Sequence, residues 1–397
     1  MRLLSQPNIL CLFLCQALFI ITISVDLTYT GLAGYQLAAV KDLATLPYSL
    51  ITLATAITTL LAAAIMRFFG RKRAFLTGAF FAVISGFTTF TAIRHNSFIL
   101  FSIGTAFVGV FQAFSQYYRL AAADFVRNEE KHKAISTILL AGVIGVLIGP
   151  SLFNRFISNS NLYSIGNAYL TTMLMGLLVF LIILCLYHET SEKQNINPVK
   201  IPKRPFIFQA IKQPIYVAAV SVNAISYAVM MFAMTATPIA MMKTHHDIHY
   251  STSVIQLHMI AMFATSFITG KLISRWGKSN VIFIGIFFNV LCALIMIFLQ
   301  SVLAFFIALL FLGIGWNLMF ISGSALLARS YDSDQKYAMQ SIAEFITFTF
   351  SGIGALSAGW VLNTYSWTTI NLCILPLLAI PVITTLYYRH QKHYEKI

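Results

Sequence analysis

Runs of about 20 apolar residues dominate the sequence and follow one another with only short polar breaks. A helix of about 20 apolar residues crosses the hydrocarbon core of a bilayer, whereas a membrane strand needs only about ten. We therefore predict an all-α membrane protein with twelve transmembrane helices. The predicted spans are 8–32, 46–68, 74–93, 97–122, 134–155, 166–187, 214–241, 252–273, 279–299, 301–327, 338–361 and 367–388.

The composition supports this prediction and also indicates an orientation. Hydrophobic residues make up 58% of the chain and charged residues 10%, against about 25% charged in a soluble domain. The net charge of +14 does not indicate nucleic-acid binding, because the basic residues flank the spans, as membrane orientation requires. With both termini in the cytoplasm, the predicted topology places all but four of the 26 Lys and Arg on the cytoplasmic side; the exceptions are Lys41, Arg94, Arg155 and Lys243.

A short basic turn between two spans occurs twice. Gly70 is followed by Arg71 and Lys72, and Gly277, which lies 207 residues after Gly70, is followed by Lys278. A charged, proline-containing segment at 188–213 separates six predicted spans from six. We predict six-helix bundles at 1–190 and 213–397, joined by a cytoplasmic linker at 191–212. Internal duplication with binding sites between the halves is typical of secondary transporters.

In this arrangement the chain resembles the major facilitator superfamily over its whole length. The basic turn of that family reads G-x-L-a-D-r-x-G-r-k, and this chain keeps Gly70, Arg71 and Lys72 but has Arg67 in place of the aspartate. The second copy matches the family at Gly270, Leu272, Arg275, Gly277 and Lys278, and has Ser274 at the aspartate position. Span five resembles the antiporter motif of the family at Gly142, Gly145, Gly149 and Pro150.

The resemblance implies a monomeric, multi-pass protein of a bacterial inner membrane that moves a small organic solute by alternating access. It implies proton coupling, and neither a cofactor, a metal nor an enzymatic activity. No G-x-x-x-x-G-K-S/T loop is present in the sequence, which argues against drive by ATP.

Two of the twelve acidic residues, Asp26 and Glu344, fall inside predicted spans. An ionised carboxylate there costs several kcal/mol unless it is paired with a cation or exposed to water. Both residues are therefore candidates for proton coupling. Each has a structural alternative: Asp26 would cap a broken helix before Gly31, and Glu344 would pair with a basic residue at the inner gate. His258 is a third candidate, although a lone histidine on an apolar helix is more often structural.

Polar and aromatic side chains within spans are candidates for the wall of a substrate cavity. Gln112 and Gln116 share one helix face because they are four residues apart, and Trp316 and Asn317 suit either a ligand wall or helix packing. The 34 Phe, 17 Tyr and 4 Trp favour a ring-bearing or amphipathic solute over a sugar. The full set of candidates is Gln112, Gln116, Tyr117, Asn223, Gln256, Trp316 and Asn317.

A third group of residues is expected to control opening and closing. Because Arg67 reverses the charge of the family motif, we hypothesise that Arg67 or a basic neighbour is held by Asp124, Glu129 or Glu344. Arg119 would snorkel to the interface, neutralise Asp124 or bind an anionic substrate. The complete set is Arg67, Gly70, Arg71, Lys72, Arg119, Asp124, Gly145, Gly149, Pro150, Gly270 and Gly277.

The direction of transport remains open between two alternatives. The partial antiporter motif favours export. Thr105, where drug antiporters of the family have Arg, and the altered basic turn favour uptake of a vitamin, siderophore or similar metabolite. A receptor or assembly factor that no longer transports is an alternative of another class, and an ion channel is a weaker one.

Overall fold

The computed structural model describes residues 2–126, 131–154, 162–189, 212–331 and 336–394, and these residues form helices and no strands. We call residues 2–189 the first half and 212–394 the second half. The first half contains η1 Arg2–Ser5, α1 Pro7–Leu37, η2 Lys41–Leu43, α2 Leu46–Phe69, α3 Arg71–Arg94, α4 Phe98–Ser115, α5 Tyr118–Asp124, α6 Lys131–Asn154 and α7 Leu162–Leu186. The second half contains α9 Pro214–Lys243, α10 Ile248–Ala264, α11 Ser266–Trp276, α12 Lys278–Phe298, α13 Val302–Leu327, α14 Lys336–Thr364 and α15 Trp367–Tyr394.

These helices account for each of the twelve predicted spans. The fourth span consists of α4 and α5, the eighth consists of α10 and α11, and every other span is one helix. Ten segments are long and apolar enough to cross a membrane alone, the bent α10–α11 pair is an eleventh, and α6 contributes the apolar stretch Leu140–Gly149. The predicted twelve-helix fold is therefore confirmed. The predicted linker 191–212 falls, except for its last residue, outside the described residues.

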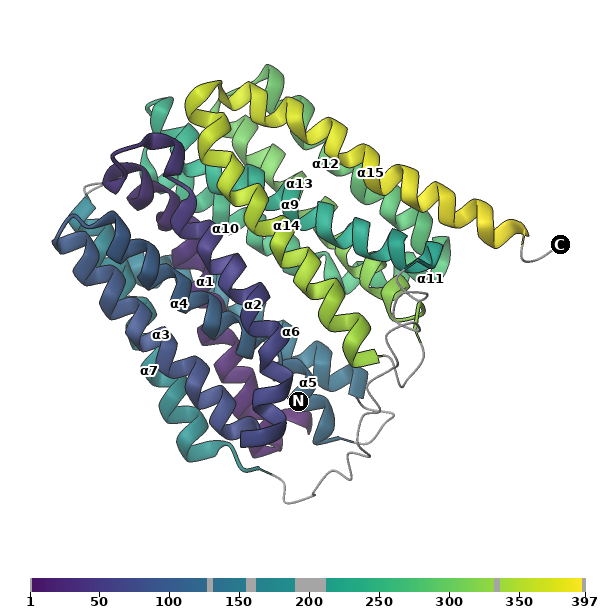
Figure 1. Cartoon of the computed structure of the whole chain (residues 1–397), viewed down its shortest axis with the longest axis horizontal. Helices are drawn as coiled ribbons and strands as arrows, with labels where there is room; N and C mark the ends of the chain where they lie inside the picture. Colours follow the sequence, from purple (N-terminus) through teal and green to yellow (C-terminus); the bar gives the residue numbers. More distant parts are fainter. Residues whose placement is uncertain (1, 127–130, 155–161, 190–211, 332–335, 395–397) are drawn as a thin grey trace.

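The helices of each half pack mainly on one another. In the first half α3 packs against α4 and α7, and α1 packs against α6 and α7; in the second half α9 packs against α13, α14 and α15. The halves meet where α2 lies along α14, where α1 meets α9 and where α6 meets α10 (Figure 1). Small residues allow this packing: a Cβ atom on Gly86 of α3 would collide with the backbone of Met173 in α7.

The two basic turns have the same backbone conformation. Gly70 has φ +82° between α2 and α3, and Gly277 has φ +79° between α11 and α12. This left-handed region is strained for residues with a side chain, which explains glycine at both positions. The shared geometry agrees with the duplication inferred from the sequence.

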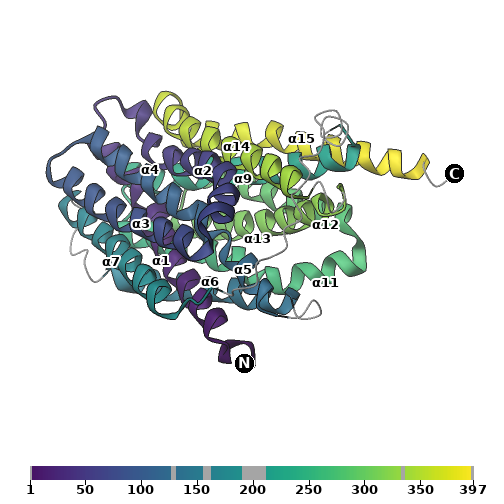
Figure 2. The same ribbon diagram turned by 60° about the horizontal axis from the view of Figure 1, so that its bottom comes forward.

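An even number of spans places both termini on one side of the molecule. We call the face on which α1 begins and α15 ends the termini face, and the opposite one the distal face. Figures 1 and 2 show α11 reaching the termini face apart from the helices of the first half. A Cβ atom on Gly270 or Gly277 would meet no described residue within 4 Å. Within the described part of the chain, the termini-face end of the eighth span is therefore loosely surrounded.

The eighth span is broken, whereas the sequence predicted one continuous helix at 252–273. Its two parts, α10 and α11, meet at 44°. At the break the side-chain amide nitrogen of Asn317 in α13 donates to the Met262 carbonyl at 2.6 Å and to Ser266 Oγ at 2.7 Å. Its oxygen accepts from Thr269 Oγ1 at 2.6 Å. A neighbouring helix thus satisfies a carbonyl at the break, as a kink within a membrane requires.

We predict that Asn317→Leu, which keeps the volume but removes three interhelical hydrogen bonds, destabilises the second half. Such bonds average roughly 0.6 kcal/mol each in a membrane, so the loss is about 1–2 kcal/mol and lowers the apparent melting temperature of the purified protein. Asn371→Leu is the matched control, because the buried Asn371 amide donates within its own helix to Trp367. Equal melting temperatures for the two variants would contradict the assignment of Asn317 to the break.

Candidate functional site

The halves are joined by hydrogen bonds that cluster toward the distal face. Thr45, just before α2, donates through Oγ1 to the Leu356 carbonyl at 3.1 Å and accepts from the Gly359 amide at 3.0 Å. Close by, the Asn363 amide donates to Asp42 Oδ1 at 2.7 Å. We call these contacts between η2, α2 and α14 the distal seam. They tie the halves together on this face of the molecule.

An aromatic ring between two lysines adds to the distal seam. The Lys41 ammonium lies 5.0 Å and the Lys243 ammonium 5.5 Å from the centroid of the Tyr35 ring, within the range of cation–π attraction. Lys41 also donates to the carbonyls of Tyr35 and Ala38, where α1 ends. Because Lys243 belongs to the second half, Tyr35 links the two halves through this cation.

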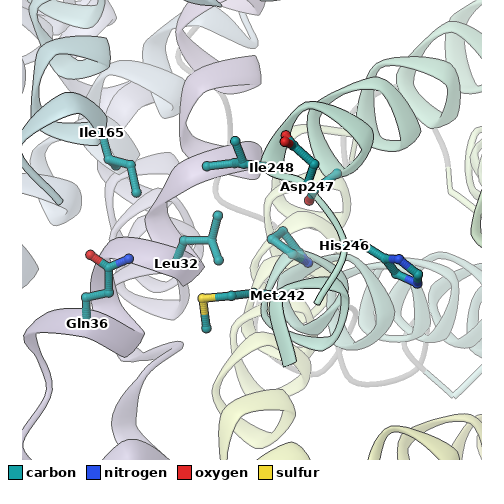
Figure 3. Close-up of a pocket in the computed structure, with 9 residues that line it drawn as sticks. Leu32, Gln36, Ile165, Met242, His246, Asp247 and Ile248 are labelled. Atoms are coloured by element: carbon teal, nitrogen blue, oxygen red, sulfur yellow. The ribbon is translucent and has the colours of Figure 1, made fainter. Parts of the chain in front are cut away.

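A small pocket opens at the distal face beside the seam. It measures about 110 Å³ and is lined by Leu32, Gln36 and Ile165 of the first half and by Met242, Asp247 and Ser251, among others, of the second (Figure 3). Because both halves line it, this pocket lies on the surface that must part before a solute can enter from the distal face.

We predict that Thr45→Val opens the distal face, because valine keeps the shape of threonine but loses both hydrogen bonds to α14. At roughly 0.6 kcal/mol per bond, the population open at this face rises about three- to tenfold. Spin labels introduced as non-natural amino acids at the exposed positions His95 and Gln300 report this opening as a longer distance. Ser357→Ala is the control, since Ser357 bonds only within α14; an unchanged distance distribution in Thr45→Val would contradict the role of the seam.

Asp26 lies deep in the first half and has no basic partner among the described residues. It is 0% exposed, and one of its oxygens accepts from Thr30 Oγ1 at 3.3 Å. Thr30 in turn bonds Tyr169 of α7 at 2.9 Å, while Asp26 Oδ2 has no hydrogen-bond partner among the residues that the structure describes. The alternative of a helix cap at a break is wrong, because α1 runs unbroken from Pro7 to Leu37.

Glu344 faces charges of the opposite half. This half-buried carboxylate of α14 interacts electrostatically with Arg119 of α5 and with Tyr117, which precedes α5. Tyr227 of α9 feels the charges of both Glu344 and Arg119. Sequence analysis had placed Glu344, Arg119 and Tyr117 in separate groups; the fold brings them together between the halves. We call these four residues the charged cluster.

Aromatic side chains of the second half form a compact group next to the charged cluster. Trp316 stacks on Phe320 with ring centroids 5.0 Å apart and planes 14° apart. Tyr227 meets Trp316, Phe320 and Phe348 edge-on at 5.1, 5.3 and 5.7 Å. We call these four residues the aromatic cluster, and Tyr227 belongs to both clusters. The Trp316 indole N–H is buried and has no hydrogen-bond partner in the described part of the chain.

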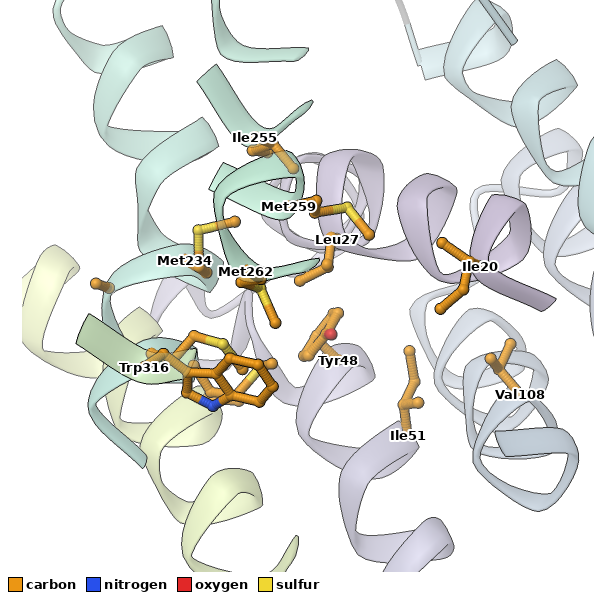
Figure 4. Packing of buried hydrophobic residues seen from close by; sticks show 14 of the residues in the cluster. Ile20, Leu27, Tyr48, Ile51, Val108, Met234, Ile255, Met259, Met262 and Trp316 are labelled. Carbon is orange, nitrogen blue, oxygen red and sulfur yellow. The ribbon is translucent and has the colours of Figure 1, made fainter. Parts of the chain in front are cut away.

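The middle of the interface between the halves is apolar. Figure 4 shows Trp316, Met259 and Met262 of the second half facing Tyr48 and Ile51 of the first. Tyr48 is buried and interacts electrostatically with Asp26 and with Tyr227. It therefore lies between the acidic group of the first half and the aromatic cluster of the second.

The remaining cavity candidates divide between the interface and the interior of one half. Gln112 and Gln116 are half-buried, and Gln256 reaches across the interface to the carbonyls of Val146 and Leu147 at 3.2 and 3.5 Å. Three other candidates lie within the second half: His258 bonds the Leu309 carbonyl at 2.9 Å, Asn223 approaches Ser324 at 3.5 Å, and Asn317 stabilises the helix break.

The first basic turn contacts other parts of the first half. Arg71 forms an ion pair with Asp124 at 2.5 Å, and its backbone amide donates to Glu189 Oε1 at 2.7 Å. Lys72 donates to the Leu184 carbonyl at 3.0 Å. A basic neighbour of Arg67 is thus held by Asp124, as one form of the latch hypothesis required, but within one half. The Arg67 side chain and Glu129 lie outside the described residues.

The glycines of span five meet the first helix. A Cβ atom on Gly145 would come within 2.6 Å of the Ala17 carbonyl, and one on Gly149 within 3.5 Å of Ser24. The α1–α6 contact therefore depends on the missing side chain at Gly145. The side chain of Pro150 lies outside the described part of the chain.

Sequence reasoning missed Tyr48, Tyr227 and Glu189. The two tyrosines are single hydroxyl-bearing residues in apolar helices, and their proximity across the interface has no counterpart in local sequence. Glu189 carried a weak signal: it is a carboxylate directly after a span. Its contact with Gly70 and Arg71 arises only because α7 ends beside the basic turn.

Two similar bundles of membrane-spanning helices, joined at one face and enclosing polar and aromatic groups between them, define a multi-pass membrane transporter. A sequence model of the family described as Major Facilitator Superfamily matches residues 9–232 and, a second time, residues 219–396. The chain belongs to the major facilitator superfamily.

Individual relatives cover nearly the whole chain. The riboflavin transporter RfnT of Brucella anthropi is 33% identical over 379 residues, which span 96% of this chain and 95% of that protein. The uncharacterized MFS-type transporter YdeG of Bacillus subtilis is 25% identical over 391 residues, 93% of this chain and 91% of that protein.

Solved structures of low sequence identity share the fold. A D-xylose–proton symporter matches with a TM-score of 0.75 at 11% identity, over 96% of each chain. A mutant of the nucleoside transporter NupG matches with a TM-score of 0.73 at 15% identity, over 96% of this chain and 99% of that one.

Proposed function

We propose that this protein imports riboflavin, or a flavin close to it, across a bacterial inner membrane together with protons that move inward down their gradient. The observation that carries the proposal is the identity of 33% to a riboflavin transporter over almost the full length of both chains. The aromatic cluster between the halves supports it, because stacked rings suit a planar heteroaromatic solute better than a sugar.

The distribution of charge supports an orientation with both termini inside. The termini face carries most of the basic residues, whereas Lys41 and Lys243 at the distal seam are two of only four placed outside by the topology. The distal face is then the external one, and the structure represents a state closed to the outside. Transport consists of the halves 1–190 and 213–397 rocking about the interface to open each face in turn.

Asp26 is the proposed proton site. A buried carboxylate without a cation is costly in a membrane, so Asp26 carries its proton in the state described and releases it when the interface becomes wet. Tyr48 connects Asp26 with the charged cluster across the interface. This contact provides a route by which a change of charge in the first half affects the second.

The protein works, in this proposal, as a single chain in the bilayer, without cofactor, nucleic acid or chemical conversion of its substrate. The alternative of export by antiport requires outward movement of the same solute. The alternative of a receptor requires binding without movement. The following experiment separates all three.

Proteoliposomes that contain the purified protein are expected to accumulate riboflavin when the external medium is more acidic than the lumen. A protonophore is expected to abolish this accumulation. Exchange of labelled for unlabelled riboflavin is expected to continue in its presence. Lumenal flavin fluorescence after washing is the measurement. Saturable binding without lumenal accumulation would support a receptor. Accumulation only under the opposite proton gradient would support export, and absence of flavin binding would overturn the proposal.

We predict that Asp26→Asn loses accumulation against a gradient but keeps riboflavin exchange, because the amide cannot bind and release a proton. Initial uptake and exchange rates in the same proteoliposomes measure the two properties. Asp247→Asn is the matched control: Asp247 caps α10 at the distal face by accepting from the His249 amide, and asparagine caps equally well. Full gradient-driven accumulation by Asp26→Asn would remove this residue from the coupling mechanism.

A further inference from the structure

The geometry points to a fixed orientation of the substrate between the halves, with its planar ring on the aromatic cluster and its hydroxylated chain at the charged cluster. The first contact involves the second half alone, whereas the second contact spans both halves. This inference rests on the proposed function, since it assigns the two chemical parts of a flavin to two places in the protein.

The aromatic cluster has the properties of a ring subsite. Tyr227 and Phe320 are half-buried, so part of each ring remains accessible beside the buried Trp316 and Phe348. A heteroaromatic ring laid on such side chains is held by stacking, largely irrespective of its substituents. This subsite therefore recognises the ring system common to all flavins.

The Trp316 indole supplies a directional contact at the same place. Trp316 is 7% exposed, and none of the described residues accepts a hydrogen bond from its N–H. A buried donor without an acceptor is energetically unfavourable, and a hydrogen bond to a ligand carbonyl oxygen would remove this cost. The ring system of a flavin carries two carbonyl groups at its polar edge. The unpartnered donor thus favours a ring with a carbonyl over a purely apolar one.

The charged cluster suits the other end of the molecule. Arg119 and Tyr117 come from the first half, whereas Glu344 and Tyr227 come from the second. No hydrogen bond or ion pair within 4.0 Å joins Arg119 to Glu344 in the described structure, although each feels the charge of the other. A chain of hydroxyl groups, each a donor and an acceptor, can bridge such a pair without adding charge.

Tyr227 belongs to both the aromatic and the charged cluster, so one ligand molecule can contact both. The Tyr227 ring contacts Trp316 and Phe320, while the same side chain interacts electrostatically with Arg119 and Glu344. Tyr227 also packs on Phe348, whose ring centroid lies 5.7 Å away and which follows Glu344 by one turn of α14, so the ring subsite lies next to the glutamate of the charged cluster. Because the charged cluster contains residues of both halves, a ligand whose chain reaches it favours the approach of the halves at the termini face more than the ring alone does.

Binding of two probes tests the assignment. Lumichrome retains the tricyclic ring and lacks the hydroxylated chain, and riboflavin has both. We expect wild-type protein to bind both probes, measured by quenching of their fluorescence, but to transport only riboflavin. Trp316→Leu is expected to weaken the binding of both probes by about tenfold or more. Trp316→Phe keeps an aromatic ring but loses the N–H, and it is expected to weaken binding by a smaller factor.

A matched tryptophan and a charge variant complete the design. Trp360 lies half-exposed near the distal end of α14, so Trp360→Leu is expected to leave both affinities unchanged. Glu344→Gln is expected to weaken the binding of riboflavin by about tenfold and to change the affinity for lumichrome less than about twofold. Melting temperatures of all variants without ligand show whether each is folded, and the Trp316→Phe variant gives a result even where Trp316→Leu does not fold.

The outcomes distinguish this inference from the proposed function. If wild-type protein binds and transports riboflavin but both Trp316 variants bind lumichrome as wild type does, the ring subsite is wrong and the function stands. If Glu344→Gln weakens the binding of both probes equally, the proposed orientation of the substrate is wrong. If lumichrome binding depends on Trp316 but riboflavin is not transported, the ring subsite stands and the vitamin assignment fails. Absence of binding of either probe to wild-type protein would overturn both.

Discussion

The absence of water in the hydrocarbon core constrains this structure more than any single contact. Each backbone N–H and C=O group within the bilayer must be satisfied by the protein itself, so the chain crosses as helices. Where a helix is interrupted, a side chain of a neighbouring helix supplies the missing hydrogen bond. At the break between α10 and α11, Asn317 donates to the Met262 carbonyl. The same constraint makes any buried charge expensive, which is why Asp26 and Glu344 attract attention as functional groups.

The interface between the halves combines a closed distal face with an apolar middle, next to which lie the aromatic and charged clusters. Thr45, Asp42 and Tyr35 tie the halves together at the distal seam through contacts of modest strength. Weak individual contacts suit a face that must open repeatedly, because a few kcal/mol decide which state is populated. Deeper in the interface, Tyr227 contacts aromatic rings and interacts electrostatically with Arg119 and Glu344, and in our proposal this couples binding of a solute to closure of the halves.

The sequence predicted the fold well and the site only in part. Hydropathy located twelve spans, because the length of an apolar run is a local property. Asp26, Glu344, Arg119 and Trp316 were identified as unusual residues in apolar surroundings for the same reason. Their grouping was not predictable: Arg119 and Glu344 are 225 residues apart in number, and only the packing of the halves brings them together. Asn317 was expected equally in a ligand wall or in helix packing, and its three hydrogen bonds to the broken span favour packing.

By itself the sequence determined the class of protein, the number of helices, the duplication marked by Gly70 and Gly277, and the few residues whose chemistry is costly in a membrane. These properties depend on composition and spacing along the chain. Only the tertiary structure decided that Arg71 pairs with Asp124 inside one half, that Glu189 contacts the basic turn, and that Tyr48 and Tyr227 come within electrostatic range of Asp26 and Glu344, respectively. Those contacts join residues from separate helices, and the register in which helices pack depends on the shapes of all the side chains between them.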